Sequence, residues 1–365
     1  MSMSIKKIAI NTGGGDAPGL NAVIHAVVMA AEKRGWKCYG IRDAFNGLMM
    51  PDLYPDGWLV PLTAESVRDI THLGGTIIGT TNKGNPLKFP VEDDDGNIVK
   101  VDRTDEIIDA FAAQKLDALI AIGGDGSLNI ANHLAQKGLR VIGVPKTIDN
   151  DLDQTVITFG FDTAVSFATE CIDRLHSTAR AHQRVMIVEV MGRYAGWIAL
   201  NAGLAGSADV ILIPEVPYDL NKIAEKLKAC TEKRPHYAIM VVSEGARPVG
   251  GDYSWMDSGE ERLGGLGYKL KPKLAEMIGR EVRVVRLGHL LRGGSPTAWD
   301  RTLSLRFGAA AVRALEEGKS GVMVALDPPA VRYVPLEQAT HRMKTVPLDC
   351  DTMLTARDLD ISFGD

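Results

Sequence analysis

The chain has 365 residues, of which 45% are hydrophobic and 24% are charged, a composition typical of a folded protein with an ordinary core. The formal net charge of −5 argues against nucleic acid or an anionic membrane as a partner. No stretch is long and apolar enough to cross a bilayer, and the N-terminus lacks a signal-peptide pattern, so we expect a cytoplasmic protein.

Short apolar runs, typical of buried strands, alternate with longer amphipathic stretches along the chain. In chain order, we expect strands at 8–10, 118–122, 141–144, 185–188, 210–213 and 238–242, and helices at 21–33, 106–115, 162–180 and 221–228. Strands that alternate with helices form mostly parallel sheets covered on both faces. We therefore predict an α/β protein of two Rossmann-like lobes, with an active site in the cleft between them.

The predicted lobes divide the chain after a strand that ends near Thr147. Residues 1–147 form the first lobe and residues 148–299 form the second, and residues 300–365 can cross back to pack on the first. The acidic residues 92–96 carry no functional prediction and are expected to form a surface turn.

The first glycine-rich loop, Thr-Gly-Gly-Gly-Asp-Ala-Pro-Gly at 12–19, lies between the first strand and the first helix. Glycines let backbone N–H groups approach phosphate oxygens, and the dipole of the following helix favours an anion. The loop is not a GxGxxG motif and lacks the lysine of a Walker loop. A phosphate-binding loop and a plain tight turn both remain open for it.

The second glycine-rich loop, Gly-Gly-Asp-Gly-Ser at 123–127, follows a fully apolar strand. An aspartate in a turn often only caps a helix. At the end of a buried strand, however, the Asp125 carboxylate is well placed to meet a hydrated Mg²⁺ that bridges phosphates.

A third loop at 145–153 carries Lys146 together with Asp149, Asp151 and Asp153. Carboxylates this close together repel one another unless they hold a cation, accept a proton or face water. A solvated acidic loop is the plain alternative. Phosphoryl transfer nevertheless needs amides for phosphates, an acid for the metal and a base for the attacking hydroxyl, and the three loops together supply that set.

Positive charge gathers around two strand-loop segments in the second half of the chain. Arg184 and Arg193 flank one apolar strand, and Arg283, His289 and Arg292 surround another. Single arginines are mostly solvated, but two basic loops at strand ends suit a sugar phosphate, which arginine binds in a bidentate way.

Five motifs in this order resemble the phosphofructokinase family: TGGGDAPGLNA, GGDGS, PKTIDNDL, QRVMIVEVMGRYAGWIAL and RLGHLLRGGSPTAWDR. The match runs from about residue 8 to residue 326. The resemblance implies a glycolytic enzyme that moves the γ-phosphoryl group of ATP to the 1-hydroxyl of fructose 6-phosphate, with Mg²⁺ as cofactor. Lys146 and Trp197 are similar to those of a subgroup that mixes ATP-using and pyrophosphate-using members.

The resemblance also assigns roles to individual residues, with the donor on the first lobe and the sugar on the second. Asp149 is the implied base, assisted by Thr147, Asp151 and Arg193. The donor set is Gly14, Gly15, Asn82, Lys83, Gly124, Asp125, Gly126 and Ser127, with Asp125 toward the metal and Gly126 and Lys146 setting donor specificity. The substrate set is Thr147, Asp149, Arg184, Met191, Gly192, Arg193, Glu244, Arg283, His289 and Arg292.

Family members are oligomers, so the resemblance implies a homodimer or homotetramer in which Arg184 and Arg283 reach a neighbouring subunit's site. Two departures stand out. Asn82 and Lys83 occupy a loop where many members have an arginine, and His25 and His176 replace effector-site arginines.

Three other functions remain open. One is a pyrophosphate-dependent phosphotransferase, although the resemblance implies that pyrophosphate users carry an acidic residue in place of Gly126. Kinases that act on NAD or on lipids share only the glycine-aspartate loop. A sugar-phosphate sensor on an inactive kinase would be expected to lack Asp125 or Asp149, and this chain has both.

Overall fold

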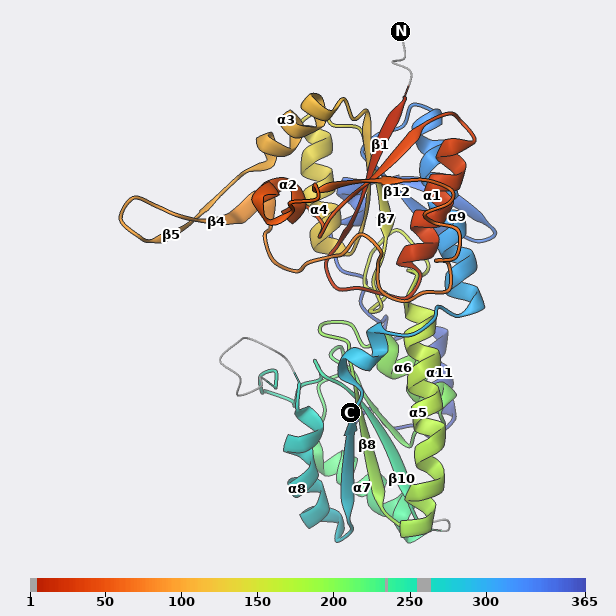
Figure 1. The fold of residues 1–365 in the computed structure, drawn as a ribbon. Coiled ribbons are helices and arrows are strands. Elements are labelled where there is room, and N and C mark those ends of the chain that lie inside the picture. Colours follow the sequence, from red (N-terminus) through yellow and green to blue (C-terminus); the bar gives the residue numbers. More distant parts are fainter. Residues whose placement is uncertain (1–4, 234–235, 255–263) are drawn as a thin grey trace. The chain divides into compact units, whose positions relative to one another are not determined.

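The computed structural model describes residues 5–233, 236–254 and 264–365, which form two compact units (Figure 1). Unit 1 comprises the chain up to residue 147 together with 152–160 and 292–343, and unit 2 comprises 148–151, 161–291 and 344–365. The observed division differs from the predicted one in three respects: residues 152–160 belong to unit 1, the chain returns to unit 1 at 292 instead of 300, and residues 344–365 belong to unit 2. The tail joins unit 2 because Ser362 forms a parallel bridge with Val210, a backbone contact that no sequence pattern announces.

In the described part of unit 1, a seven-stranded sheet has the order β13-β12-β7-β6-β1-β2-β3. Its strands are β1 (Lys7–Gly13), β2 (Lys37–Ile41), β3 (Leu59–Leu62), β6 (Ala118–Gly123), β7 (Val141–Pro145), β12 (Val322–Asp327) and β13 (Ala330–Pro335). The strands run parallel except at the two edges, where β3 and β13 are antiparallel to their neighbours. The predicted α/β class with mostly parallel strands is confirmed.

Helices cover both faces of the unit 1 sheet (Figure 1). One face carries α1 (Leu20–Glu32) and α9 (Ala298–Glu316), and the other carries α2 (Asn46–Met49), α3 (Thr104–Gln114), α4 (Asp125–Gln136) and α10 (Leu336–Ala339). Successive strand residues point to opposite faces, so Ile8 and Ile10 enter the core under α1 while Ala9 enters the core under α4. A strand buried on both faces therefore reads as a continuous apolar run.

In unit 2 the described strands form a parallel sheet in the order β11-β8-β10-β9. The strands are β8 (Val185–Val190), β9 (Val210–Leu212), β10 (Ala238–Ser243) and β11 (Val282–Arg286). The helices are α5 (Phe161–His182), α6 (Trp197–Ala205), α7 (Leu220–Glu232), α8 (Leu266–Ile278) and α11 (Asp351–Asp358). None of the helices in the described ranges of either unit is long and apolar enough to span a bilayer.

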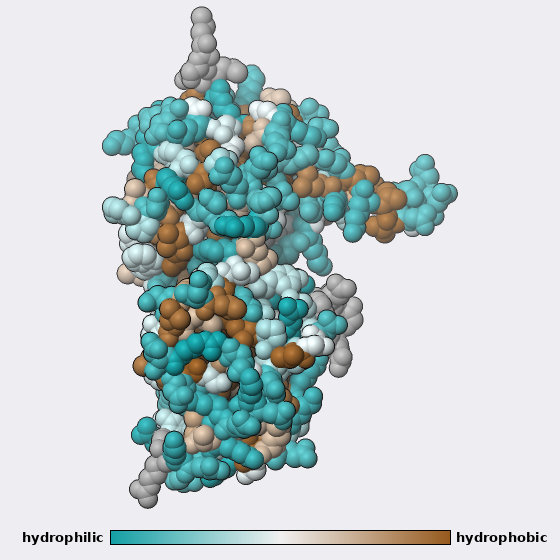
Figure 2. Space-filling view, turned by 180° about the vertical axis from the view of Figure 1, so that it is seen from behind, coloured by the Kyte–Doolittle hydropathy of each residue, from teal (hydrophilic) through white to brown (hydrophobic). Residues whose placement is uncertain are grey.

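A hairpin of β4 (Phe89–Glu92) and β5 (Ile98–Val101) projects from unit 1 (Figure 1). Apolar side chains lie exposed on it, namely those of Val91, Ile98, Val99 and Val101, and Figure 2 shows them as a hydrophobic stretch behind a hydrophilic tip. At the tip, the Asp93 carboxylate accepts hydrogen bonds from the N–H groups of Asp95 and Asn97 at 3.1 and 2.8 Å. The expected acidic surface turn is confirmed, but the hairpin around it was not predicted.

Candidate active site

The loops that follow β1, β6 and β7 meet at one edge of the unit 1 sheet. Gly13 at the end of β1 pairs with Gly123 of β6, and Gly123 pairs with Pro145 of β7. In the sheet, β2 lies on one side of β1, whereas β6 and β7 lie on the other side of β1. Such a reversal of strand order opens a crevice at the carboxyl ends of the strands, where α/β proteins bind ligands.

A cavity of about 330 Å³ lies at this edge, within the size range of small-molecule sites. Every residue of the predicted donor set lines it: Gly14, Gly15, Asn82, Lys83, Gly124, Asp125, Gly126 and Ser127. Lys146 and Thr147 line it as well. The structure thus brings residues from four separate loops around one space.

The first glycine loop is held by the segment at 79–83 and by Lys146. The Gly14 N–H donates to the Thr81 carbonyl at 3.1 Å, and the Thr80 hydroxyl donates to the Gly14 carbonyl at 2.6 Å. Lys146 is buried and donates from its Nζ to the Gly15 carbonyl. Gly14 has a φ of 79°, a left-handed conformation that glycine adopts without a steric penalty.

Ser127 packs against the ends of both central strands, which explains the glycines there. A Cβ atom on Gly123 would lie 2.3 Å from the Ser127 Cβ, and one on Gly13 would lie 2.5 Å from the Ser127 Oγ. This close packing sets the N-terminus of α4, which begins at Asp125, beside the cavity. The positive end of that helix dipole favours an anion such as phosphate.

Gly126 stands apart from the other cavity glycines because a Cβ atom there would meet nothing within 4 Å. The position is therefore open toward the cavity, and its φ does not fall in the left-handed range. A side chain would fit here without backbone strain and would occupy ligand space.

Among the described residues that line the cavity, Asp125 is the one that carries a carboxylate. No cluster of three or more His, Cys, Asp or Glu side chains that could hold a metal ion is found in the described ranges. Mg²⁺ bound with a nucleotide commonly uses one or two protein carboxylates plus phosphate oxygens and water. One carboxylate beside a glycine-rich loop fits that mode of binding.

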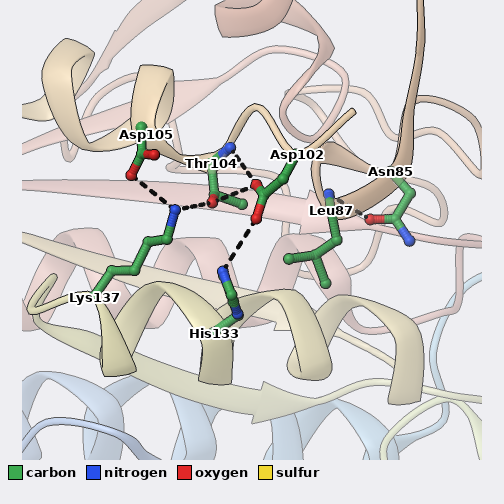
Figure 3. A network of polar contacts seen from close by, with 7 residues as sticks. All are labelled: Asn85, Leu87, Asp102, Thr104, Asp105, His133 and Lys137. Carbon is green, nitrogen blue, oxygen red and sulfur yellow. Dashed lines mark hydrogen bonds and ion pairs between the residues drawn. The ribbon is translucent and has the colours of Figure 1, made fainter. Parts of the chain in front are cut away.

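A polar network lies at the root of the β4–β5 hairpin (Figure 3). Asp102 accepts hydrogen bonds from the Thr104 hydroxyl and N–H at 2.6 and 2.8 Å, and these bonds lower the pKa of the Asp102 carboxyl. The Nζ of Lys137, directly after α4, donates to the Thr104 hydroxyl at 2.8 Å and to the Asp105 carboxylate at 2.7 Å, and the Nε2 of His133 in α4 lies 3.5 Å from the Asp102 carboxylate. The start of α3 is thereby tied to α4.

The same network supports Asn85 and Pro86, which line the cavity and which sequence reasoning missed. Arg103, between Asp102 and Thr104, donates its N–H to the Pro86 carbonyl at 2.8 Å. Asn85 accepts a hydrogen bond from the Leu87 N–H at 3.0 Å and so caps the short 3-10 turn at Pro86–Lys88 (Figure 3). An Asn-Pro turn is visible in the sequence, but its place in a cavity wall is not.

The carboxyl edge of the unit 2 sheet gathers Met191, Gly192, Arg193, Glu244 and His289. The Glu244 N–H donates to the Val190 carbonyl at 3.0 Å, and the Ser243 hydroxyl donates to the Gly192 carbonyl at 2.5 Å. Both bonds fasten the loop after β8 to the loop after β10. His289 belongs to the 3-10 turn Gly288–Arg292 that follows β11, the other neighbour of β8.

Arg184 and Arg283 lie at the opposite, amino edge of the same sheet. Arg184 directly precedes β8 and pairs with Glu281 at 3.0 Å, and Arg283 in the second position of β11 pairs with the same carboxylate. The six residues of β8 span about 20 Å at roughly 3.3 Å per residue. Within one chain these two arginines are therefore far from Arg193 and His289.

Arg292 departs from the predicted grouping because it belongs to unit 1 and lines the cavity of the donor set. Its Nη1 donates to the Asp16 carbonyl at 3.2 Å, and a Cβ atom on Gly15 would lie 2.7 Å from that Nη1. The sequence placed Arg292 with the sugar-binding lobe because it follows His289 closely, but the chain passes from unit 2 to unit 1 between Leu291 and Arg292.

The fold and the cavity define a doubly wound α/β protein of the kind that binds phosphate groups at strand ends. A family model described as Phosphofructokinase matches residues 7–315. The chain belongs to the phosphofructokinase family.

Named relatives include users of two phosphoryl donors. An ATP-dependent 6-phosphofructokinase of Chloroflexus aurantiacus is 49% identical over 100% of this chain and 99% of the relative. A pyrophosphate–fructose 6-phosphate 1-phosphotransferase of Amycolatopsis mediterranei is 47% identical over 94% of this chain and 97% of the relative. Among solved structures, the T-state phosphofructokinase of Pichia pastoris matches with a TM-score of 0.79 and 29% identity, over 100% of this chain and 37% of that one.

Proposed function

We propose that this chain transfers the γ-phosphoryl group of Mg·ATP to the 1-hydroxyl of fructose 6-phosphate, giving fructose 1,6-bisphosphate and ADP. The observation that carries the proposal is the single cavity at the β1/β6 reversal point, which every residue of the predicted donor set lines. The ATP-dependent relative covers the whole chain and supports the same reaction.

Unit 1 holds the donor in this proposal. The amides of the glycine loop and of the α4 N-terminus bind phosphate oxygens, and Lys146 adds a positive charge beside Gly15. Asp125 would hold Mg²⁺, which neutralises charge on the donor phosphates when it is bound. Gly14, Gly15, Asn82, Lys83 and Gly124 complete the donor contacts with Gly126 and Ser127.

Asp149 is the proposed general base. Its carboxylate takes the proton of the 1-hydroxyl while the hydroxyl oxygen attacks the γ-phosphorus and ADP leaves. Thr147 and Asp151 assist from the same loop. Arg193, which follows Gly192 at the end of β8, stabilises charge on the transferring group.

The sugar phosphate is held by residues at the carboxyl edge of unit 2: Met191, Gly192, Arg193, Glu244 and His289. Arg292 of unit 1 takes part as well. Arg184 and Arg283 serve the site of a neighbouring subunit, because the length of β8 keeps them away from this edge of their own chain. The enzyme is accordingly a homodimer or a homotetramer.

ATP is favoured over pyrophosphate by the open space at Gly126. ATP differs from pyrophosphate by an adenosine monophosphate moiety that needs room beyond the two reacting phosphates, and a glycine leaves that room uncharged. Lys146 and the pyrophosphate-using relative support the alternative donor, but a lysine beside the reacting phosphates serves either one.

A coupled assay of fructose 6-phosphate phosphorylation, with Mg·ATP and Mg·pyrophosphate offered separately, tests the proposal. We expect the larger kcat/KM with ATP. A larger kcat/KM with pyrophosphate would reverse the donor, and no transfer from either donor would refute the reaction itself.

A further inference from the structure

Lys344 opens the C-terminal segment of unit 2, a part of the chain to which the sequence analysis gave no role. Its backbone N–H donates to the Asp151 carbonyl at 2.8 Å, and its Nζ donates to the Asn150 Oδ1 at 2.8 Å. Lys344 therefore contacts both residues that directly follow Asp149, the proposed base.

Asn150 is the residue at which this loop turns. It is buried and has a left-handed backbone conformation, with a φ of 52°. Such a conformation costs an ordinary L-residue roughly 1–2 kcal/mol, and asparagine is one of the few side chains that visits it routinely. The backbone angles at Asn150 set the direction of the peptide that joins it to Asp149. A contact that fixes the Asn150 side chain thus also restricts the Asp149 carboxylate.

A second set of contacts fastens Lys344 to the start of α6. The indole Nε1 of Trp197 donates to the Lys344 carbonyl at 2.9 Å, and the Lys344 Nζ lies 5.8 Å from the centre of the Trp197 ring. Trp197 is the first residue of α6, just after the loop that carries Arg193.

Two residues further on, Val346 donates its N–H to the Glu215 carboxylate at 2.8 Å, and the Gly196 N–H donates to the same carboxylate at 3.1 Å. The segment at 344–346 is therefore held at both of its ends against the α6 start while Lys344 reaches the loop at 149–151. An anchor fixed in this way can restrain the loop, whereas a loose lysine on the surface could not.

We infer that Lys344 is a positioning residue for the phosphoryl transfer: through Asn150 it holds the Asp149 carboxylate in the direction needed to deprotonate the acceptor hydroxyl. The inference rests on the proposed function. The ammonium group also brings a positive charge to a loop with two carboxylates, which offsets their mutual repulsion.

Lys344→Met tests the inference because methionine keeps most of the side-chain length and removes the donor. Displacing a catalytic group by about 1 Å can cost on the order of 10²-fold in rate, so we expect kcat to fall by about 10- to 100-fold. The KM values for ATP and fructose 6-phosphate should change little, because the residues that bind them stay in place.

Lys226→Met is the matched control. Lys226 of α7 pairs with Asp360 at 2.7 Å and ties the same C-terminal segment to unit 2 without contacting the loop at 149–151. We expect a similar small loss of thermal stability in both variants and a near-normal kcat in the control only. An equal loss of kcat in both variants, or a raised KM with unchanged kcat in Lys344→Met, would overturn the inference.

A double-mutant cycle of Lys344→Met and Asn150→Gly tests whether Lys344 affects kcat through its contact with Asn150. Glycine keeps the left-handed backbone accessible but removes the amide that Lys344 contacts. If Lys344 acts through Asn150, the double variant loses no more kcat than the worse single variant, since the two effects share one contact. Additive losses would show that Lys344 acts elsewhere.

Hydrogen exchange of the backbone amides at 148–152 separates this inference from the proposed function, because it needs no turnover. We expect faster exchange in Lys344→Met than in the wild type, and unchanged exchange in Lys226→Met. Unchanged exchange in Lys344→Met would refute the positioning role whatever the enzyme does. If exchange is faster in Lys344→Met but the wild type transfers no phosphoryl group to fructose 6-phosphate, Lys344 holds the loop and has no role in that reaction.

Discussion

Unit 1 places every residue predicted to bind the donor around one cavity, whereas unit 2 divides the residues predicted to bind the sugar phosphate between the two ends of its sheet. In unit 1 the donor residues follow neighbouring strand ends or pack directly on them. In unit 2, Arg184 and Arg283 sit with Glu281 at the amino edge, and Arg193, Glu244 and His289 sit at the carboxyl edge. In a single chain the first set therefore lies around one cavity, whereas the second set lies in two separate places.

The largest effect is expected at Asp149, whose loop lies between the two units in the sequence. Asp149→Asn removes the base but keeps the size of the side chain, and loss of a positioned base costs about 10²- to 10⁴-fold in kcat. Fructose 6-phosphate should still bind, as measured by its KM or by calorimetry. A near-normal kcat in this variant would show that another group takes the proton.

Arg283→Ala tests whether the sugar site is shared, because the arginine is proposed to act on a neighbouring subunit. Losing a charge-assisted contact to phosphate, typically worth about 1.5–3 kcal/mol, should raise the KM for fructose 6-phosphate by roughly 10- to 100-fold. The KM for ATP should remain near the wild-type value.

Mixing two impaired chains, assayed at a fructose 6-phosphate concentration well below the KM of Arg283→Ala, makes this test sharper. Arg283→Ala and Asp149→Asn chains, mixed under conditions that exchange subunits, should regain part of the activity because one hybrid site receives both intact residues. Gly126→Asp mixed with Asp149→Asn is the control and should not regain activity with ATP, since both residues are proposed to serve the same chain's site. No recovery in the first mixture, with exchange confirmed by mass, would mean that the site is not shared.

Gly126→Asp tests whether ATP occupies the space beside Gly126 in the cavity. A Cβ atom at this position meets nothing within 4 Å, so the variant should fold with a melting temperature close to that of the wild type. Its carboxylate would stand beside the donor phosphates, where like charges a few ångströms apart repel by on the order of 1 kcal/mol or more. We expect kcat/KM with ATP to fall at least about tenfold, and unaltered ATP use would place the nucleotide elsewhere in the cavity.

The smallest expected effect concerns the pH dependence of stability in unit 2. Burial raises the pKa of the Glu215 carboxyl above its ordinary value of 4.5, and hydrogen bonds from Val346 and Gly196 oppose that rise only in part. In this window the folded state binds more protons than the unfolded state, so stability falls as pH rises from 4.5 through the raised pKa.

Glu215→Gln removes this titration and should flatten the fall of melting temperature with pH above 4.5. The wild type and the variant can be compared by thermal melts at closely spaced pH values in one buffer series. Identical slopes would mean that Glu215 titrates alike in both states and carries no burial cost.

Local patterns in the sequence predicted much of the fold and named many of the residues that line the unit 1 cavity. The expected strands at 8–10, 118–122 and 141–144 lie within β1, β6 and β7, and those at 185–188 and 238–242 lie within β8 and β10. Continuous apolar runs indicate strands buried on both faces, and glycine-rich loops at the ends of such strands predict phosphate sites. The carboxyl ends of parallel strands lie at the same edge of a sheet, so the loops that follow these strands lie close together.

Less regular elements escaped prediction. The edge strand β3 and the hairpin β4–β5 are mostly half-buried or exposed, so they lack the buried apolar run that marks a central strand. The hairpin also contains Pro90, and proline argues against a strand because its nitrogen carries no hydrogen to donate to a partner strand.

The sequence by itself determined the α/β class, the family and the loops that line the unit 1 cavity, because each of these rests on residues close together along the chain. Only the tertiary structure decided that Arg184 and Arg283 share Glu281 at the amino edge of the unit 2 sheet, that Arg292 lines the unit 1 cavity, and that Lys344 contacts the loop at 149–151. Lys344 and Asn150 are 194 residues apart, and a contact over that distance follows from how the chain crosses between units, which no local pattern encodes.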